Sequence, residues 1–398
     1  MNSQPASHRD PVGWSGIIAF GFLALGLYRL GIPTRFYFDE VHYVPAARIL
    51  REFSHLTNQE HPLIGKELIA LGITLFGDNP HGWRALSALA GAVSLFAFMR
   101  GLWFASLSRF AALAGGVLLA TGFLLFVHSR IAMLDIFMIC FTMIALWMCA
   151  GAVREPETGR WRLAMAGVAL GLAIGTKWNA APLAMLPGIG FFIARAISAR
   201  ARFLTAKDGA PVPGITLIEA AFWLGAVPLL TYVLSFWPVF FYEQDRLTLG
   251  SFLHYQQQMI ELQESTVKPH PYMSRWDDWI VNRRAIWYLY ENLDGAQRGV
   301  LLIGNPLTML LGLPALAWCA FAGFFRRNRA ALCVFALYAV SFGMWIVAPK
   351  PIQFYYHYML PSCFLIAALA LALDALWRRG GWMWRGAALA AVAASCGI

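Results

Sequence analysis

The sequence predicts an all-α protein that crosses a membrane many times. Of the 398 residues, 59% are hydrophobic and only 13% are charged, which is far from the composition of soluble domains. Apolar runs long enough to cross a bilayer recur along the chain, so we expect a single integral membrane domain over 1–398. They predict about eleven spans, at 13–32, 82–104, 109–128, 131–152, 161–177, 180–199, 215–237, 300–323, 330–348, 353–377 and 382–398.

Basic residues are distributed unevenly between the short loops at the two ends of these spans. With the N-terminus in the cytoplasm, each short outer loop holds one basic residue, Arg130, Lys177 or Lys350. The cytoplasmic loops then hold Arg100, Arg109, Arg154, Arg160, Arg162, Arg195, Arg200, Arg202, Lys207, Arg326, Arg327, Arg329, Arg378, Arg379 and Arg385. By the positive-inside rule, two long polar segments, 33–81 and 238–299, lie outside the cell inner (plasma) membrane. Topology therefore explains the net charge of +10, and no nucleic-acid module is evident.

The first apolar run and the cysteines argue against a cleaved signal peptide, a disulfide framework and a zinc site. No small-residue cleavage site follows the first apolar run, so we expect that run to stay as a signal anchor. All six cysteines lie inside apolar runs without metal-type spacing, which predicts packing residues rather than a disulfide framework or a zinc site.

Two adjacent acids, Asp39 and Glu40, follow the first apolar run and stand among aromatic residues. Because neighbouring carboxylates repel each other when both are desolvated, one of them is expected to have a raised pKa. That carboxylate could act as a base. The alternative is an ordinary solvated loop after a helix.

The same outer segment continues through His61, Pro62 and Lys66 into a short apolar run that ends before Gly77. This run is too short to span, so it predicts an amphipathic helix along the membrane face, with Pro62 in its first turn. Lys66 would lie at headgroup height, where its ammonium could meet a lipid phosphate. Ordinary snorkelling of an interfacial lysine is the alternative.

Ionisable residues also occur at the outer ends of two spans. Arg84 lies at the mouth of 82–104, and Asp135 lies several residues into 131–152. An ionisable residue inside a span indicates function by default, with a structural contact between helices as the alternative. Arg130 and Asp135 are spaced i and i+5 and diverge around a helix, so Asp135 is expected to face another segment.

Taken together, these motifs show a family resemblance. They are FDEVHY at 38–43, HPLIGK at 61–66, RALSALAG at 84–91, Leu134-Asp135, GTKW at 175–178, HPYMSRW at 270–276, RAIWY at 284–288, GNP at 304–306 and YHY at 356–358. In this order they resemble the protein O-mannosyltransferases, polytopic glycosyltransferases of the GT-C type. The resemblance covers nearly the whole chain.

The chain departs from the family pattern in two places. The histidine motif usually has two prolines, and here it reads His61-Pro62-Leu63. Eukaryotic members carry a large β-rich domain in an outer loop, and 238–299 is too short to contain one. The chain therefore resembles the minimal prokaryotic form.

The resemblance implies transfer of a sugar, typically mannose, from a polyprenyl phosphate to Ser or Thr hydroxyls of a secreted or membrane protein. The reaction would take place on the outer face with inversion. A serine hydroxyl is a poor nucleophile, so a carboxylate that takes its proton lowers the barrier, and Asp39 is the candidate base. Glu40 is expected to hold the acceptor or to orient Asp39.

The leaving phosphate needs neutralisation of its charge more than it needs a general acid. Arg84 is expected to clamp two phosphate oxygens, while Lys66, with Arg283, Arg284 or Lys350, adds positive charge. Supporting or substrate-binding roles are expected for His61, Asp135, Lys177, His270, Arg284, Tyr356 and His357. The aromatic and amide residues of 238–299 suit either a cover on the acceptor side or an interfacial belt.

Cofactor and acceptor stay open at this point. Some related GT-C enzymes bind a divalent metal between comparable acids, and Asp39 and Asp135 are candidates, but without a further ligand motif we assign no metal ligand. A GT-C transferase that acts on a glycolipid such as lipid A is one alternative. A secondary transporter is another, although paired broken helices in two related halves are not evident.

Overall fold

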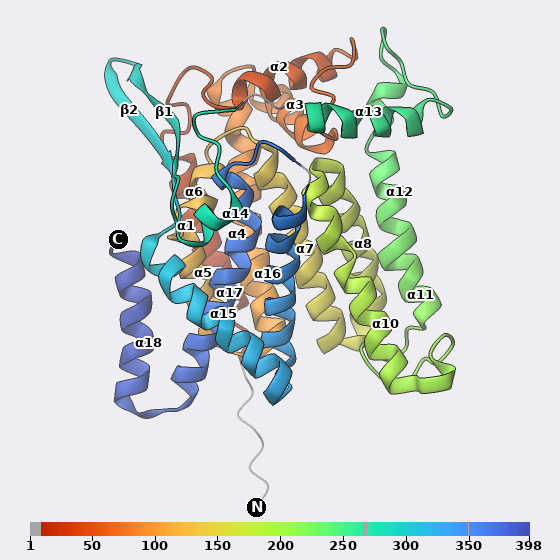
Figure 1. Cartoon of the computed structure of the whole chain (residues 1–398), viewed down its shortest axis with the longest axis vertical. Coiled ribbons are helices and arrows are strands. Elements are labelled where there is room, and N and C mark those ends of the chain that lie inside the picture. Colours follow the sequence, from red (N-terminus) through yellow and green to blue (C-terminus); the bar gives the residue numbers. More distant parts are fainter. Residues whose placement is uncertain (1–8, 266–268, 349) are drawn as a thin grey trace, which may run out of the picture.

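The computed structural model describes residues 9–265, 269–348 and 350–398 and is built mostly of helices (Figure 1). The body consists of α1 (Val12–Leu27), α4 (Pro80–Ser106), α5 (Arg109–Ala120), α7 (Leu134–Arg154), α8 (Gly159–Thr176), α10 (Leu186–Ala199), α11 (Leu217–Ala221), α12 (Val227–Leu234), α15 (Pro306–Arg326), α16 (Arg329–Val347), α17 (Met359–Arg378) and α18 (Gly381–Cys396). Short connecting elements are α6 (Leu124–His128), α9 (Ala181–Ala184), η1 (Pro156–Thr158), η2 (Trp178–Ala180), η3 (Arg200–Arg202), η4 (Phe222–Ala226), η5 (Trp237–Phe240) and η6 (Tyr355–Tyr358). The outer layer contains α2 (Glu40–Arg51), α3 (Ile64–Phe76), α13 (Phe252–Ser265), α14 (Trp276–Ile280), β1 (Ile286–Leu293) and β2 (Ala296–Leu302).

Each of the predicted apolar runs coincides with helical structure, and the protein is a multi-pass membrane protein. Within the described residues, 7 helical segments are long and apolar enough to cross a membrane, fewer than the eleven that the sequence predicts. Helices α1 and α5 are shorter apolar helices, and the predicted runs at 161–177 and 382–398 form α8 and α18, which are not among the seven. Two predicted boundaries were wrong. The run at 13–32 ends as a helix at Leu27, and the run at 300–323 begins with strand β2, so its helix starts only at Pro306.

Small residues let the spanning helices approach one another closely. A Cβ atom at Gly167 would overlap the Trp223 carbonyl, and one at Gly171 would overlap the Pro228 carbonyl. Because apolar side chains gain little from leaving lipid, such close backbone contacts are what hold helices together in a bilayer. They fix α8 against the η4–α12 segment. All six cysteines are free thiols.

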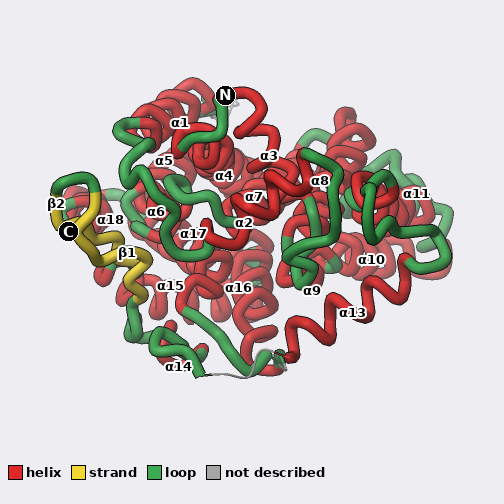
Figure 2. The backbone as a smooth tube through the Cα atoms, turned by 90° about the horizontal axis from the view of Figure 1, so that it is seen from above, coloured by secondary structure: helices red, strands yellow, loops and turns green. Residues whose placement is uncertain are grey.

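The outer layer lies across one end of the bundle. Helices α2, α3 and α13 run nearly perpendicular to the spanning helices, and seen from this side α2 covers the middle of the molecule (Figures 1 and 2). The predicted amphipathic helix is present as α3, but it begins at Ile64, so Pro62 precedes the helix instead of occupying its first turn.

The hairpin formed by β1 and β2 is a departure from the all-α prediction. Its antiparallel register pairs Ile286 with Leu302 and Leu293 with Ala296. The tip is Asp294-Gly295, and both residues have positive φ, at 53° and 73°. An Asp-Gly pair with left-handed backbone suits a tight hairpin, because its twist matches that of the strands.

Candidate active site

Asp39 stands directly before the first turn of α2, with a half-buried side chain. The preceding residue, Phe38, has a φ of 51°, which is uncommon for a residue with a bulky side chain. Its ring stacks on Tyr288 at a centroid distance of 3.9 Å and meets Tyr356 edge-on at 6.0 Å. Within the described residues, the Asp39 carboxylate takes part in no hydrogen bond or ion pair. The fold therefore presents a carboxylate without a partner, against an aromatic wall.

Glu40, the neighbour of Asp39, forms a fully buried ion pair with Arg84. The Arg84 Nε and Nη2 atoms donate to Glu40 Oε1 and Oε2, each at 2.7 Å, and both side chains are 0% exposed. The other Arg84 N–H groups donate to the carbonyls of Leu30, Pro33 and Arg35. A guanidinium has five N–H donors, and all five are used here.

This geometry does not fit the predicted phosphate clamp at Arg84, nor the acceptor-holding role for Glu40. Besides the Arg84 pair, Glu40 Oε1 accepts a hydrogen bond from the Ala132 backbone N–H at 2.9 Å. The pair therefore joins the turn before α2 to α4 and to the segment before α7. The role that remains for Glu40 is to hold the turn that carries Asp39.

A second buried ion pair lies beside Asp39. The Lys177 ammonium donates to both oxygens of Asp135, at 2.9 and 2.8 Å, and the two residues are 5% and 1% exposed. Asp135 stands in the first turn of α7, while Lys177 follows the last residue of α8. The Lys177 ammonium also lies 5.0 Å from the centroid of the Tyr356 ring. As predicted, Asp135 faces another segment, and the Arg130 guanidinium instead donates to carbonyls at the end of α1.

The electrostatic surroundings of Asp39 combine burial with two ammonium groups. Burial raises the pKa of Asp39 to about 6, an effect that Asp135 strengthens and that Lys177, His42 and Lys350 oppose. Lys350 follows the outer end of α16, and burial together with Lys177 lowers its pKa to about 8, against the opposing pull of the acids. A buried carboxylate with a raised pKa beside two cations is typical of an active site.

Two predicted histidines line the same region. Burial lowers the pKa of His61, and its ring lies 6.1 Å from that of Tyr43. His357 accepts a hydrogen bond from the Phe354 backbone N–H through Nδ1. His61 Nδ1 and His357 Nε2 are buried without a hydrogen-bond partner among the described residues. Both can therefore accept a bond from, or donate one to, a bound substrate.

Three other predicted residues form no hydrogen bond or ion pair with Asp39, Asp135 or Lys177 within the described residues. Lys66 is 1% exposed, and its ammonium donates to the carbonyls of Asn58 and His61 at 2.7 and 2.9 Å. The prediction that Lys66 lies at the membrane surface was therefore wrong. His270 is exposed and packs edge-on against Phe354 at 5.3 Å. Arg284 is exposed with a φ of 63°, and no hydrogen bond or ion pair within the described residues joins it to the cluster.

Comparison with known proteins places this arrangement in a family. Residues 60–222 match the model described as dolichyl-phosphate-mannose-protein mannosyltransferase. Residues 248–397 match the C-terminal four-transmembrane region of protein O-mannosyltransferase. Together the two models span most of the chain. The chain belongs to the protein O-mannosyltransferase family.

Relatives of this chain carry a matching description. It is 28% identical to a polyprenol-phosphate-mannose–protein mannosyltransferase of Mycolicibacterium smegmatis, over 86% of this chain and 78% of that protein. A Corynebacterium glutamicum protein of the same description is 27% identical, over 93% of this chain and 84% of that protein. The similarity therefore extends over most of both chains.

Solved structures share the fold of this O-mannosyltransferase family member. The Saccharomyces cerevisiae Pmt1-Pmt2 complex bound to the sugar donor superposes with a TM-score of 0.83, at 13% identity, over 99% of this chain and 89% of that chain. ArnT from Cupriavidus metallidurans bound to undecaprenyl phosphate superposes with a TM-score of 0.63, at 16% identity, over 96% of this chain and 63% of that chain. These likenesses establish the GT-C fold.

Sequence reasoning missed one polar contact of this candidate site. His128, 0% exposed at the end of α6, lies with Nε2 3.2 Å from the Tyr288 hydroxyl, whose ring stacks on Phe38. Tyr288 ends the RAIWY motif and is one of the aromatic residues of 238–299, and neither pattern indicates a polar partner for it. His128 ends a long apolar run, and a histidine there is the signal that could have identified it.

The two acids considered for a metal do not fit one well. Both oxygens of Asp135 already accept hydrogen bonds from Lys177. Within the described residues, no group of three His, Cys, Asp or Glu side chains is placed to hold an ion. Hard divalent cations are typically held by more oxygen ligands than this.

Proposed function

We propose that this protein is a polyprenyl-phosphate-mannose–protein mannosyltransferase. It transfers the sugar to Ser or Thr hydroxyls at the extracytoplasmic face of the inner membrane. The family assignment and the descriptions of its relatives support the class of reaction. The observation that carries the assignment to a site is the unpartnered Asp39 carboxylate beside the Lys177 and Lys350 ammonium groups.

Asp39 acts as the general base. An acceptor hydroxyl attacks the anomeric carbon of the sugar as the Asp39 carboxylate takes its proton. The bond from that carbon to the phosphate oxygen breaks on the opposite side, and the electron pair stays on the phosphate. Attack opposite the leaving group inverts the anomeric centre. A base with a pKa near 6 is largely ionised at neutral pH, and it is a stronger proton acceptor than an ordinary Asp.

Lys350 and Lys177 stabilise the leaving phosphate in place of Arg84 and Lys66. Both ammonium groups act on Asp39, so a phosphate next to the attacked carbon would lie within their field. Lys350 is half-buried, and no carboxylate within the described residues forms an ion pair with it. Its charge is therefore free for an anion. Charge on the phosphate grows as the bond to carbon breaks, so a fixed cation there favours the transition state.

The remaining polar residues position these groups. Asp135 holds the Lys177 ammonium, and the Glu40–Arg84 pair holds the turn before Asp39. His61 and His357 supply buried ring nitrogens for sugar or acceptor contacts. His270 and Arg284, exposed in the 238–299 segment, belong to the cover on the acceptor side.

Purified protein in detergent tests this function. It is mixed with polyprenyl-phosphate mannose and, in separate reactions, with Ser/Thr peptides or with a glycolipid acceptor. We expect mannosylated peptide, detected by mass spectrometry, and no mannosylated glycolipid. Transfer to the glycolipid alone would assign the protein to lipid modification and reject the proposal.

A further inference from the structure

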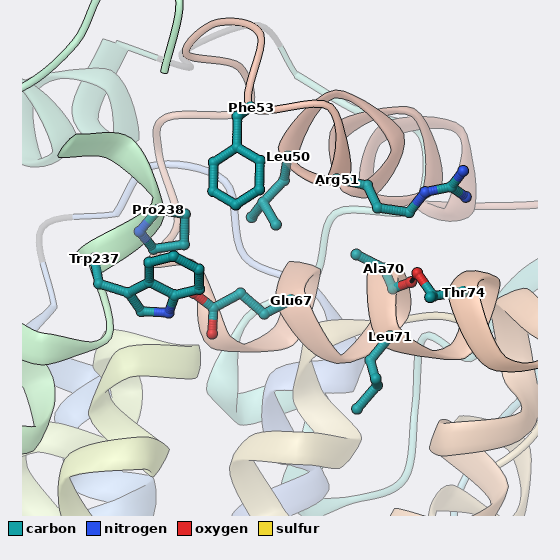
Figure 3. Close-up of a pocket in the computed structure, with 9 residues that line it drawn as sticks. All are labelled: Leu50, Arg51, Phe53, Glu67, Ala70, Leu71, Thr74, Trp237 and Pro238. Carbon is teal, nitrogen blue, oxygen red and sulfur yellow. Dashed lines mark hydrogen bonds between the residues drawn. The ribbon is translucent and has the colours of Figure 1, made fainter. Parts of the chain in front are cut away.

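A pocket of about 230 Å³ lies between α2, α3 and the η5 turn (Figure 3). None of the residues that line it belongs to the cluster around Asp39. Its walls are mostly apolar, and they include Phe53, which closely follows α2, and Trp237 of η5, whose rings lie 5.7 Å apart. Backbone hydrogen bonds from Glu243 and Gln244 to the carbonyls of Phe53 and Ser54 tie these two segments together.

The Glu67 carboxyl is the acceptor group inside this pocket. Its Oε1 atom is buried and has no hydrogen-bond partner among the described residues. Figure 3 shows the carboxyl beside the Trp237 indole ring. The neighbouring Lys66 is directed to the carbonyls of Asn58 and His61. A buried carboxyl oxygen without a donor is costly, so the pocket has an unused capacity to accept a hydrogen bond.

A cation lines the same pocket. Arg51 is exposed at the end of α2, and its guanidinium lies away from Trp237 (Figure 3). The charge of Arg51 acts on Asp78, but the Asp78 carboxylate is paired with Arg48 at 2.8 Å. The pocket therefore offers an acceptor within and a positive charge at its rim.

The pocket lies where the bilayer meets water. Trp237 closely follows the spanning segment Leu217–Leu234 and is 52% exposed. Along α3, the large apolar side chains of Leu71, Leu75 and Phe76 are exposed. Tryptophan at the end of a span and apolar residues on a surface helix are typical of the interfacial zone. These surroundings favour a membrane lipid as the molecule that enters this pocket from beside α3.

We propose that this pocket binds a phospholipid whose headgroup carries a primary ammonium, as ethanolamine does. The ammonium donates to Glu67, the phosphate faces Arg51, and the acyl chains follow the exposed apolar residues of α3. Drug-sized ligands occupy pockets of roughly 300–1,000 Å³, so this smaller pocket suits a headgroup. A choline headgroup has no N–H to donate to Glu67, and a headgroup with only negative charge would face a carboxyl.

Native mass spectrometry of the full-length protein tests this inference. The protein is mixed with equal amounts of phosphatidylethanolamine and phosphatidylcholine with identical chains, and bound lipids are counted. We expect ethanolamine lipid to be favoured by roughly tenfold, the scale of one charge-assisted hydrogen bond. Glu67→Met keeps the shape of the side chain and removes the acceptor, so the preference should disappear. Glu264→Met, on the exposed face of α13, is the matched control and should keep it.

A second variant tests the pocket without altering Glu67. Leu71→Trp adds bulk at a half-exposed wall position and should reduce the bound ethanolamine lipid while donor binding persists. An unchanged lipid preference in Glu67→Met would overturn the proposal, as would equal binding of the two lipids by the unmodified protein. Binding of an acceptor peptide that depends on Glu67, with no lipid preference, would assign the pocket to the peptide instead.

Discussion

Arg84 and Glu40 share two hydrogen bonds of 2.7 Å, and neither side chain is exposed. Breaking a buried ion pair leaves one charge without a partner, which costs about 3–5 kcal/mol. We therefore expect Arg84→Ala and Glu40→Ala to lower the yield and the thermal stability of the purified protein sharply. Arg84→Met combined with Glu40→Leu should recover part of that stability.

The same experiment separates structure from phosphate binding. If Arg84 clamped the donor, Arg84→Ala would retain its stability and lose donor affinity. Unfolding curves measured beside donor binding therefore distinguish the two roles of this arginine.

In our account, the positive charge of Lys350 stabilises the phosphate of the donor. Lys350→Ala should weaken donor binding and transfer by roughly tenfold or more, because one charge-assisted contact is lost. Lys207→Ala, an exposed lysine at the opposite end of the bundle, is the control and should leave both unchanged. Normal donor affinity in Lys350→Ala would remove this residue from the site.

The pH profile of kcat/KM reports the free enzyme. The base must be ionised, so activity should fall as the pH drops through the Asp39 pKa of about 6. Lys350 must be protonated to stabilise the leaving phosphate, so activity should also fall as the pH rises through the Lys350 pKa of about 8. Lys350→Arg should move the alkaline limb upward, because a guanidinium keeps its charge. A profile without an acid limb near pH 6 would contradict the assignment of the base.

Topology can be measured in intact cells by labelling single cysteines with an impermeant reagent. The exposed residues Cys333 and Cys396 are first replaced. Leu249→Cys, at an 85% exposed position in the outer segment, should react from outside. Arg327→Cys, between α15 and α16, should react only after the membrane is opened. The reverse pattern would place the site in the cytoplasm.

The sequence predicts the spanning helices well because apolar composition is a local signal. The direction of Asp135 also follows from helical spacing alone. The pairing of Arg84 with Glu40 cannot be predicted from local sequence, because only the fold brings α4 and the turn before α2 together. Lys66 looked like an interfacial residue for the same reason, because the carbonyls of the 58–61 loop that bind it lie outside its helix. The hairpin did carry a local signal, the Asp294-Gly295 pair, that a helix-only interpretation overlooked.

The role of Asp39 is the central claim, and one comparison tests it directly. Asp39→Asn keeps the shape of the side chain and removes its proton affinity, and donor affinity and peptide transfer are measured on the same preparation. We predict that transfer falls by roughly 10²–10⁴-fold, the usual contribution of a general base, while donor binding persists. Near-normal transfer to a Ser/Thr peptide by Asp39→Asn would contradict the account.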